Sequence, residues 1–464
     1  MHVALGSDPN AKLIGATLAR MAYDHDVIVV GAGVAGLAAA WDLRDRDVVV
    51  LECAQRVGGR IRSESRGDLW LNLGAHVYAG DDSATGILLR EAGAEPRDIP
   101  GVLSGISYKG KLVAEGRTEL YPFRLPISLR GRIEFVRRGL RLRRLVAQYG
   151  EMARQRPGET SAQLQQRMLD FMGDRSFTEE LGVFSPEVDA FFRCTLTRGT
   201  GEPEQITAGY GVGYFHLVWN ADEGLGRNIV GGPQTFMDAL AAPLGDRIRL
   251  GADVVRVAQD ADGVTVEVDE GGARRSLRAR AAILATPSHV TAAIAEGLPA
   301  DLDAALRAIT YGPMISAAFL TDEDGPQRWD DVYAIATPGR SISMVFNQGN
   351  VLRPFRAKGS SFMTYASANL ARRIQGESDE AILDLYQREL ESVLPELRGH
   401  VVERLIHRVD PGIPYPFVGR GRIQPALLQP LGRLHLCGDY LGTWYAETSI
   451  WTGRAAAAAA AAQA

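Results

Sequence analysis

A buried strand that runs into a glycine-rich turn and a helix is the feature that most constrains this chain. The segment Asp26–Gly36 reads DVIVVGAGVAG. In such a pattern Gly31 permits a tight turn, Gly33 lets backbone N–H groups approach a phosphate, and Gly36 lets the helix pack closely on the strand. The positive end of the helix then faces the anion. The segment therefore predicts the opening of a Rossmann-like fold that holds the pyrophosphate of a dinucleotide.

A second apolar strand and an acidic residue strengthen this interpretation. Val48–Leu51 ends at Glu52, which stands 21 positions after Gly31. A carboxylate at this distance can bind the ribose hydroxyls of adenosine, and it disfavours a 2′-phosphate. The segment Arg56–Arg62 follows, and its glycine pair and arginines offer further backbone N–H and guanidinium groups for phosphate.

Several stretches spread over nearly the whole chain add up to a family resemblance. They are Gly31–Glu52, Arg56–Arg62, Leu71–His76, Gly231–Phe236, Ala282–Pro287 and Leu436–Asp439. In this order they resemble the FAD-dependent family of monoamine and polyamine oxidases, protoporphyrinogen oxidases and phytoene desaturases. The resemblance implies an α/β fold, in which a discontinuous Rossmann-like FAD-binding domain is combined with an α+β substrate-binding domain.

The resemblance also implies how the two domains share the chain. We expect residues 23–80, 228–287 and 421–464 to form the FAD-binding domain, after an N-terminal extension at 1–22. Residues 81–227 and 288–420 would form the substrate domain, with a helical subdomain at about 120–227. A carboxylate at Asp439 would lie near the ribityl and phosphate groups. The helix that begins near Glu447 would direct its N-terminus at the flavin, where it stabilises the negative charge of the reduced ring.

The residues expected to contact FAD lie in these motifs and in the predicted strand around Val254. They are Gly31, Gly33, Ala35, Gly36, Glu52, Arg56, Gly59, Arg60, Gly74, Ala75, His76, Val254, Gly438, Asp439, Glu447 and Thr448. Monoamine oxidases attach the flavin through a cysteine in a loop ahead of the last strand, and the matching segment 410–417 has none. We therefore expect noncovalent FAD.

Periodicity predicts the remaining elements. Alternation with period two indicates paired strands at Asp246–Val257 and Gly263–Val268, whereas helical spacing marks long helices between them and the first motifs. The other expected strands are Ala281–Ala285, Ile315–Leu320 and Arg433–Cys437, and the expected helices are Ile133–Tyr149, Ser161–Met172 and Asp379–Leu394. The alanines at 455–462 extend the last helix, and the alternative beyond about residue 458 is a solvated tail.

Candidate catalytic residues follow from the resemblance. Amine oxidases carry a lysine near flavin N5, and the matching strand places Ser316 there. A serine cannot act as a cationic or basic partner for the water at that place, so this departure favours the porphyrinogen oxidase and desaturase branches. Tyr445 matches the tyrosine that forms one wall of an aromatic cage. Tyr415 or Phe417 would form the opposite wall, or would simply pack in a proline-rich turn.

An aromatic stretch before the chain returns to the FAD domain is a further candidate for the pocket. His216 within it could act as a general base, although a lone histidine in such a setting is more often packed and hydrogen-bonded. The residues expected to line the substrate pocket are Tyr210, Tyr214, Trp219, Tyr415, Phe417 and Trp444.

Arginines at 130–144 crowd a predicted amphipathic helix. We expect a solvated, salt-bridged surface helix, because the arginines scatter around it. The alternatives are a helix that lies on anionic lipid, as a peripheral membrane contact, and one that guides an acidic substrate.

Composition excludes several classes of function. The 464 residues carry a formal charge of −5 and 46% hydrophobic residues, without the basic surplus that nucleic-acid binding requires. No stretch reaches the roughly 18 continuous apolar residues of a membrane-spanning helix. The cysteines at 53, 194 and 437 lack the spacing of metal ligands. Their odd number predicts reduced thiols and a cytoplasmic location.

The sequence thus predicts an FAD-dependent oxidoreductase that takes a hydride from a C–C or C–N bond of a small cyclic or aromatic substrate. The reaction that we expect first is porphyrinogen oxidation or the desaturation of a secondary metabolite. O₂ or another acceptor would then reoxidise the flavin. Oxidation of an amine or an L-amino acid is the alternative. A flavin-binding redox sensor without turnover is an alternative of a different class.

Overall fold

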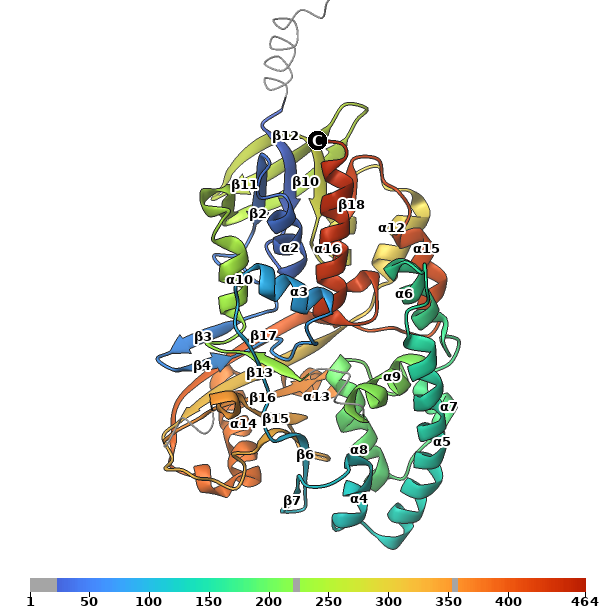
Figure 1. Ribbon diagram of the computed structural model, residues 1–464, viewed down its shortest axis with the longest axis vertical. Coiled ribbons are helices and arrows are strands. Elements are labelled where there is room, and N and C mark those ends of the chain that lie inside the picture. The colour runs from blue at the N-terminus through green and yellow to red at the C-terminus, as the bar shows by residue number, and fades with distance from the viewer. Residues whose placement is uncertain (1–22, 220–225, 353–357) are drawn as a thin grey trace, which may run out of the picture.

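The computed structural model describes residues 23–219, 226–352 and 358–464, so the predicted extension at 1–22 lies outside the described residues. The molecule is elongated, with one β-sheet and its helices at the upper end of Figure 1 and a second sheet with its own helices at the lower end. Among the described residues, no helix is both long and apolar enough to cross a bilayer.

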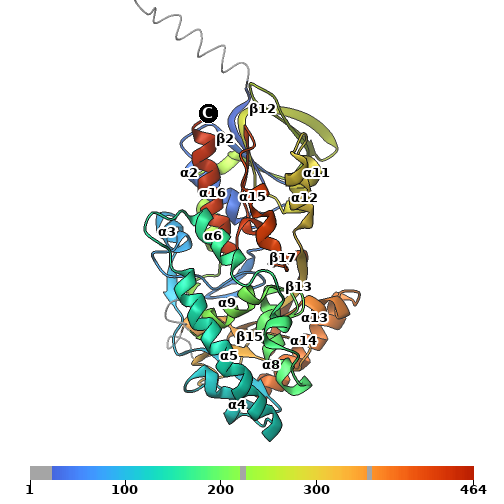
Figure 2. The ribbon, with the colours of Figure 1, turned by 90° about the vertical axis from the view of Figure 1, so that its right-hand side faces the viewer.

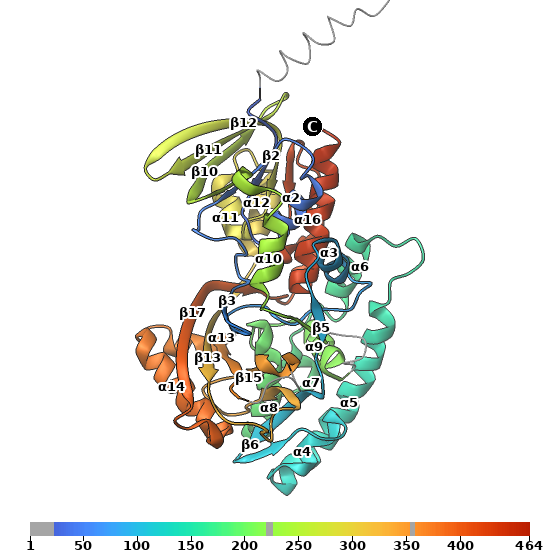
Figure 3. The same cartoon turned by 60° about the vertical axis from the view of Figure 1, so that its left-hand side comes forward.

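The first sheet is built around β1 and has the strand order β10-β11-β12-β1-β2-β9, with β18 paired to β12. β1 pairs in parallel with β2 and β12, and the apolar residues of β1 and β2 are buried on both faces, as in most parallel sheets. Figure 3 shows the antiparallel strands β10 and β11 extending from this parallel part. The strands are β1 (His25–Val30), β2 (Val48–Glu52), β9 (Ile248–Leu250), β10 (Ala252–Gln259), β11 (Val264–Glu270), β12 (Ala273–Leu284) and β18 (Leu434–Leu436).

Helices cover both faces of this sheet (Figure 2). One face carries α2 (Val34–Asp42), α3 (Ala84–Glu91), α10 (Gln234–Ala241) and α16 (Tyr445–Ala461). The other carries α11 (Ser288–Ile294), α12 (Ala300–Ala308) and α15 (Gln424–Leu427). The alanine run belongs to α16, in which Ala456, Ala457 and Ala460 are buried. A solvated tail at these alanines is therefore wrong.

α2 and α16 approach each other at backbone distance. A Cβ atom at Gly453 of α16 would lie 2.3 Å from the carbonyl oxygen of Ala35 in α2. On its other side α2 lies close to the turn that follows β1, because a Cβ at Gly36 would lie 1.9 Å from the Gly31 carbonyl oxygen. Only glycine fits at both positions, so these contacts fix the place of α2.

The second sheet has the order β17-β13-β16-β15-β14-β6-β7. α13 (Ala368–Ile374) and α14 (Asp379–Val393) pack on one face with a large apolar core. The strands are β6 (Val102–Tyr108), β7 (Lys111–Val113), β13 (Tyr311–Thr321), β14 (Val332–Ala336), β15 (Met344–Asn347), β16 (Ser361–Ser367) and β17 (Val401–Pro414). Two short pairs join the sheets, β3 (Ser63–Arg66) with β4 (Leu69–Asn72) and β5 (Pro96–Asp98) with β8 (Arg227–Ile229).

A layer of helices with an aromatic core lies beside this sheet, at the right of the lower end in Figure 1. Its helices are α4 (Tyr121–Arg124), α5 (Leu129–Ala153), α6 (Ser161–Asp170), α7 (Phe177–Leu181), α8 (Pro186–Leu196) and α9 (Ala208–Trp219). α5 is the arginine-rich helix. Arg141 pairs with Glu180 at 2.5 Å, and Arg138 donates to the Leu181 carbonyl, which supports the expected surface helix. α5 also exposes an apolar row of Leu129, Ile133, Val136 and Leu140.

The packing places some segments on the other side of the expected domain boundaries. α3 lies within 81–227 but packs on α16, and α11 and α12 lie within 288–420 but pack in the core of the first sheet. Conversely, β4 lies within 23–80 but contacts β13 and β16 of the second sheet. Buried apolar faces, rather than the motifs, decide where each segment lies.

The contact between α2 and α16 generates the first prediction. Gly453→Ala should lower the free energy of unfolding by roughly 1–3 kcal/mol, because its methyl group overlaps the Ala35 carbonyl oxygen. Thermal unfolding checks this. The matched control is Gly139→Ala in α5, where a Cβ would meet no atom within 4 Å. There only helix propensity changes, so the control should gain stability. An equal change in the free energy of unfolding in the two variants would contradict the close contact between α2 and α16.

Candidate active site

A groove of about 390 Å³ lies at the carboxyl ends of β1, β2 and β12, and we call it the dinucleotide groove. Its walls come from the turn between β1 and α2, the end of β2, the segment 58–61, the segment 252–254, the turn after β12, and Gly438–Asp439. Parallel strands end at the same edge of their sheet, and the crevice outside that edge is where α/β folds bind ligands.

The β1–α2 turn forms the anion-binding part of the groove. Gly31 has a φ of +102°, which other residues rarely adopt. Gly33 borders the open groove, since a Cβ there would meet no atom within 4 Å. No side chain caps the start of α2, so the N–H groups of its first turn are available to an anion. A pyrophosphate fits this turn.

Glu52 stands at the end of β2 with its side chain fixed. Its Oε2 accepts a hydrogen bond from the Ala32 N–H at 2.7 Å, and its Oε1 accepts one from the Ala54 N–H at 2.8 Å. Each carboxylate oxygen keeps a lone pair for a further donor. This arrangement suits the two ribose hydroxyls of an adenosine.

An ion pair closes the groove from the other side. Arg60 binds both carboxylate oxygens of Asp439, at 2.7 and 3.0 Å, and donates to the Gly412 carbonyl at 2.9 Å. Burial works to lower the pKa of Arg60, but the Asp439 carboxylate raises it, so the arginine remains charged. The pair joins three segments that are far apart in the sequence.

The structure brings many of the expected cofactor residues together, but not all of them. Those that line the groove are Gly31, Gly33, Ala35, Glu52, Gly59, Arg60, Val254, Gly438 and Asp439. Sequence reasoning missed other lining residues, among them His289, Pro411 and Ser449. The Thr286–Pro287 stop after a buried strand could have indicated His289, because it ends at the same edge of the sheet.

Two expected cofactor residues make structural contacts and are not among the residues that line the groove, so their contact with FAD stays a prediction. Arg56 donates to the carbonyls of Val57, Gly59 and Ile61 and so braces the glycine turn from outside the groove. The Glu447 carboxylate accepts from the N–H groups of Ala84 and Thr85 at 2.6 and 3.0 Å. The Glu447 carboxylate thereby caps the N-terminus of α3.

Ser316 also differs from the expectation of a catalytic side chain. It is fully buried in β13, and its hydroxyl donates to the Leu73 carbonyl at 2.8 Å. The hydroxyl therefore holds the backbone just before Gly74–Ala75, the segment that the resemblance places against the flavin. Ser316 positions this segment and is not among the residues that line the cavities described here.

His76 follows that segment and is 7% exposed. Its Nδ1 lies 2.8 Å from the Gly74 carbonyl oxygen, whereas its buried Nε2 has no hydrogen-bond partner among the described residues. The ring stands edge-on to Phe346 at 4.5 Å between centroids. Burial lowers the pKa of His76 to about 4, so the imidazole is neutral at neutral pH.

A cluster of phenols surrounds the start of α16. The Tyr445 hydroxyl is hydrogen-bonded to the hydroxyls of Tyr210 and Tyr214 of α9, the latter at 2.6 Å. Trp444 stacks on Tyr210 with 5.3 Å between ring centroids. Burial raises the pKa of all three phenols, so they are neutral donors and acceptors. The aromatic wall expected at the flavin is thus held from α9. Thr448, in the next turn, is buried and accepts from the Trp444 N–H.

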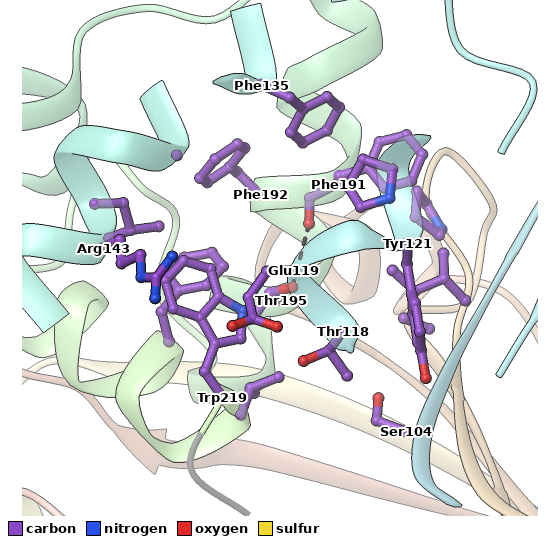
Figure 4. A pocket seen from close by; sticks show the side chains of 18 of the residues that line it. Ser104, Thr118, Glu119, Tyr121, Phe135, Arg143, Phe191, Phe192, Thr195 and Trp219 are labelled. Atoms are coloured by element: carbon purple, nitrogen blue, oxygen red, sulfur yellow. Dashed lines mark hydrogen bonds between the residues drawn. The ribbon is translucent and has the colours of Figure 1, made fainter. Parts of the chain in front are cut away.

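Two connected cavities lie between the second sheet and the helical layer. The inner pocket, of about 270 Å³, is lined by the sheet residues Ile106, Ala336 and Met344 and by aromatic side chains, several of which Figure 4 labels. The cleft, of about 860 Å³, adjoins it and includes Tyr333 and Phe346 beside His76. The aromatic walls of the inner pocket are Phe135, Phe191, Phe192, Phe215 and Trp219.

The expected pocket residues divide between these cavities and the core. Trp219 lines both cavities, and His216 lines the cleft with its ring 5.4 Å from that of Tyr149. Tyr415 and Phe417 instead pack in the aromatic core of the helical layer, which is the alternative named for them. Tyr210, Tyr214 and Trp444 pack with Tyr445 in the aromatic core of the helical layer, and none of the four lines either cavity.

Arg198 is the charged residue that sequence reasoning missed. It lies in the turn Thr197–Gly199, lines both cavities, and lies near the phenol of Tyr365 of β16. Burial works to lower its pKa, but the phenols of Tyr365 and Tyr214 raise it, so the side chain is a cation. An arginine in a glycine-containing turn has no sequence feature that distinguishes an arginine in a cavity wall from one on the protein surface.

The neutral state of His76 predicts a pH dependence of stability. Its pKa falls from an ordinary 6.5 in the unfolded chain to about 4 in the folded protein. Between these values only the unfolded state binds the proton, so stability is lost as the pH falls from 6.5 to 4, by on the order of 3 kcal/mol. Urea unfolding of wild type and His76→Gln checks this. In His76→Gln the free energy of unfolding should fall less steeply between pH 6.5 and 4 than in the wild type. The surface variant His400→Gln should show the wild-type pH dependence. A wild-type pH dependence in His76→Gln would contradict the low pKa of His76.

Comparison with known proteins extends these observations. Solved structures share the fold at low identity: a putrescine oxidase bound to putrescine has a TM-score of 0.74 at 22% identity, covering 94% of this chain and 99% of its own. Cyclohexylamine oxidase from Brevibacterium oxydans has a TM-score of 0.73 at 19% identity, covering 95% of this chain and 99% of its own.

Relatives and a family model agree with the fold. Amine oxidase [flavin-containing] B of Sus scrofa is 25% identical over 94% of this chain and 86% of its own length. Putrescine oxidase of Kocuria rosea is 26% identical over 58% of each chain. The model of the family described as flavin containing amine oxidoreductase matches residues 34–461. The chain therefore belongs to the flavin containing amine oxidoreductase family and is an FAD-dependent oxidoreductase.

Proposed function

We propose that this protein oxidises the C–N bond of a small amine and that O₂ reoxidises its flavin. The observation that carries the proposal is the aromatic wall at the start of α16, where Tyr210 and Tyr214 hold the Tyr445 hydroxyl. The resemblance directs this end of α16 at the flavin ring, and an aromatic face there suits an amine. Curated relatives that carry amine oxidase names support the same reading.

The residues around the cavities suit an amine in its neutral form. FAD, when bound, supplies the hydride acceptor. Aromatic side chains form much of the lining of the inner pocket, and an apolar setting disfavours an ammonium relative to the neutral amine. The cation of Arg198 acts in the same direction. The chain thus needs to bind, orient and desolvate the amine, with little acid–base machinery of its own.

The residue at position 316 favours a second candidate. The chain has lysines only at 12, 109, 111 and 358, so none lies on β13 where amine oxidases carry theirs. This departure fits oxidation of a C–C bond, as in the porphyrinogen oxidases and desaturases that the sequence analysis placed first. Such a reaction needs no cation beside a water near the flavin.

Reduction of the flavin under anaerobic conditions tests the proposal. We expect at least one primary amine or amino acid to bleach the flavin absorbance, whereas a porphyrinogen should leave it unchanged. Admission of O₂ should then restore the yellow colour. Bleaching by the porphyrinogen alone would replace the proposal with the second candidate, and bleaching by none of these compounds would remove both.

Cysteine placement supports noncovalent attachment. The three cysteines are free thiols, which also supports the predicted cytoplasmic location. Cys194 and Cys437 are buried, and burial raises the pKa of the Cys194 thiol to about 11 and that of the Cys437 thiol to about 12. Neither is a reactive thiolate. Cys53 lines the dinucleotide groove beside Glu52, at the end that suits the ribose.

Acid precipitation checks the attachment. Trichloroacetic acid should leave a colourless protein pellet and a yellow supernatant, because unfolding releases a cofactor that is held only by contacts of the folded state. Cys53→Ser should behave in the same way. A yellow pellet from the wild type would contradict noncovalent attachment, and a yellow pellet lost only in Cys53→Ser would identify the linking residue.

A further inference from the structure

We infer that Arg198 forms an anion subsite and that the substrate is an apolar or aromatic molecule that carries a carboxylate. The inference deepens the proposed function, on which its choice of reaction rests, but binding of the carboxylate does not depend on turnover. It rests on the position of the guanidinium, on the balance of charges around the two cavities, and on the apolar walls of the inner pocket.

Arg198 stands where the inner pocket and the cleft meet. Its side chain contributes to the wall of both cavities. The guanidinium lies near the phenol of Tyr365, whose neighbour Met344 in the next strand lines the inner pocket. A phenol occupies only part of the five N–H donors of an arginine, so donors remain for a ligand. The geometry offers a bidentate partner for a carboxylate.

The charges that line the cavities do not cancel. Among the described residues, four arginines and two glutamates line the two cavities. Glu119 is paired with Arg117 at 2.9 Å, and Glu151 with Arg154 at 3.0 Å. Arg198 and Arg143 therefore have no carboxylate within salt-bridge distance in the described part of the chain. Arg143 is exposed and its charge acts on Glu119, whereas Arg198 is partly buried and no carboxylate acts on it, so Arg198 is the cation that remains for an anion.

The inner pocket accepts an aromatic body next to this cation. Its volume of about 270 Å³ exceeds the roughly 150 Å³ of a cavity that binds benzene. Figure 4 shows Phe135 and Phe192 on the side of the pocket away from Ser104 and Thr118. A ring lying among these side chains would leave a polar group free to reach Arg198, which has an exposed part in the same cavity.

The same arrangement disfavours a diamine. A substrate with a second ammonium would bring that charge toward Arg198, and like charges at short distance repel. Putrescine-like compounds are therefore poor candidates, although a putrescine oxidase shares the fold.

Arg198 also lies close to the reactive end. Its charge acts on Tyr214, which is hydrogen-bonded to Tyr445, and on His76, which follows the segment expected at the flavin. A carboxylate on Arg198 would therefore hold the neighbouring carbons of the substrate beside Tyr445 and His76. This makes Arg198 the residue that selects the substrate and orients it.

Binding of small aromatic probes to the FAD-loaded protein tests the inference by isothermal titration calorimetry. Benzoate should bind more tightly than its neutral isostere benzamide and than benzylamine. Arg198→Gln should weaken benzoate binding by roughly tenfold to a hundredfold, because a charge-assisted pair is lost, and should leave benzamide binding within about twofold. Arg198→Lys keeps the charge without the planar fork and should fall between the two.

Arg144→Gln is the matched control. Arg144 is an exposed arginine of α5 that does not line either cavity, so this variant should bind benzoate as the wild type does. Equal affinities for benzoate and benzamide in the wild type, or unchanged benzoate affinity in Arg198→Gln, would overturn the inference. If the circular dichroism spectrum shows that Arg198→Gln is unfolded, the test rests on two other measurements. These are the affinities of the wild type for benzoate and benzamide, and the benzoate affinity of Arg198→Lys.

The result is separable from the proposed function. Benzoate binding through Arg198 in a protein whose flavin no amine reduces would overturn amine oxidation and keep the subsite. Reduction by simple amines with no preference for benzoate over benzamide would keep amine oxidation and overturn the subsite.

Discussion

The whole site depends on the backbone-distance packing of α2 between the turn after β1 and α16. Gly36 lets α2 approach the Gly31 carbonyl, and Gly453 lets α16 approach the Ala35 carbonyl. These contacts aim the N-terminus of α2 into the dinucleotide groove, where its free N–H groups make the anion site. They also set the direction of α16, whose first turn carries Tyr445. One packing constraint therefore places both ends of the cofactor site.

Polar contacts then tie the second sheet to this frame. Arg60 joins Asp439 to the Gly412 carbonyl of β17, and Ser316 of β13 holds the Leu73 carbonyl. Because β13 and β17 are neighbours in one sheet, the backbone at Gly74 is fixed relative to that sheet. The cavities on the sheet are thereby fixed relative to the flavin segment. These contacts of Arg60 and Ser316 fix the positions of backbone segments, and we assign no chemical step to them.

The substrate side combines apolar walls with surplus positive charge. A partly buried arginine is costly to leave without an anion, and among the described residues phenols and the Cys194 thiol, but no carboxylate, act on Arg198. The family is named for amine oxidation, whereas this cavity adds recognition of an acid. An amine and a carboxylate on one small molecule satisfy both features, and the serine at 316 marks a further departure from the usual amine oxidase arrangement.

The sequence by itself determined the cofactor and most of the groove, because Gly31, Gly33, Glu52 and Asp439 act through local turns and strand ends that a linear motif encodes. It also located β13, α5 and α14 from their periodicity, and α16 from the helix propensity of its alanines, to within about four residues. Only the tertiary structure decided the uses of Arg56, Glu447 and Ser316, since their partners lie wherever a backbone carbonyl or a helix end happens to pass. The same holds for Arg198. Its proposed role rests on the absence of a neighbouring carboxylate among the described residues, and a sequence does not show which charges are paired in the folded protein.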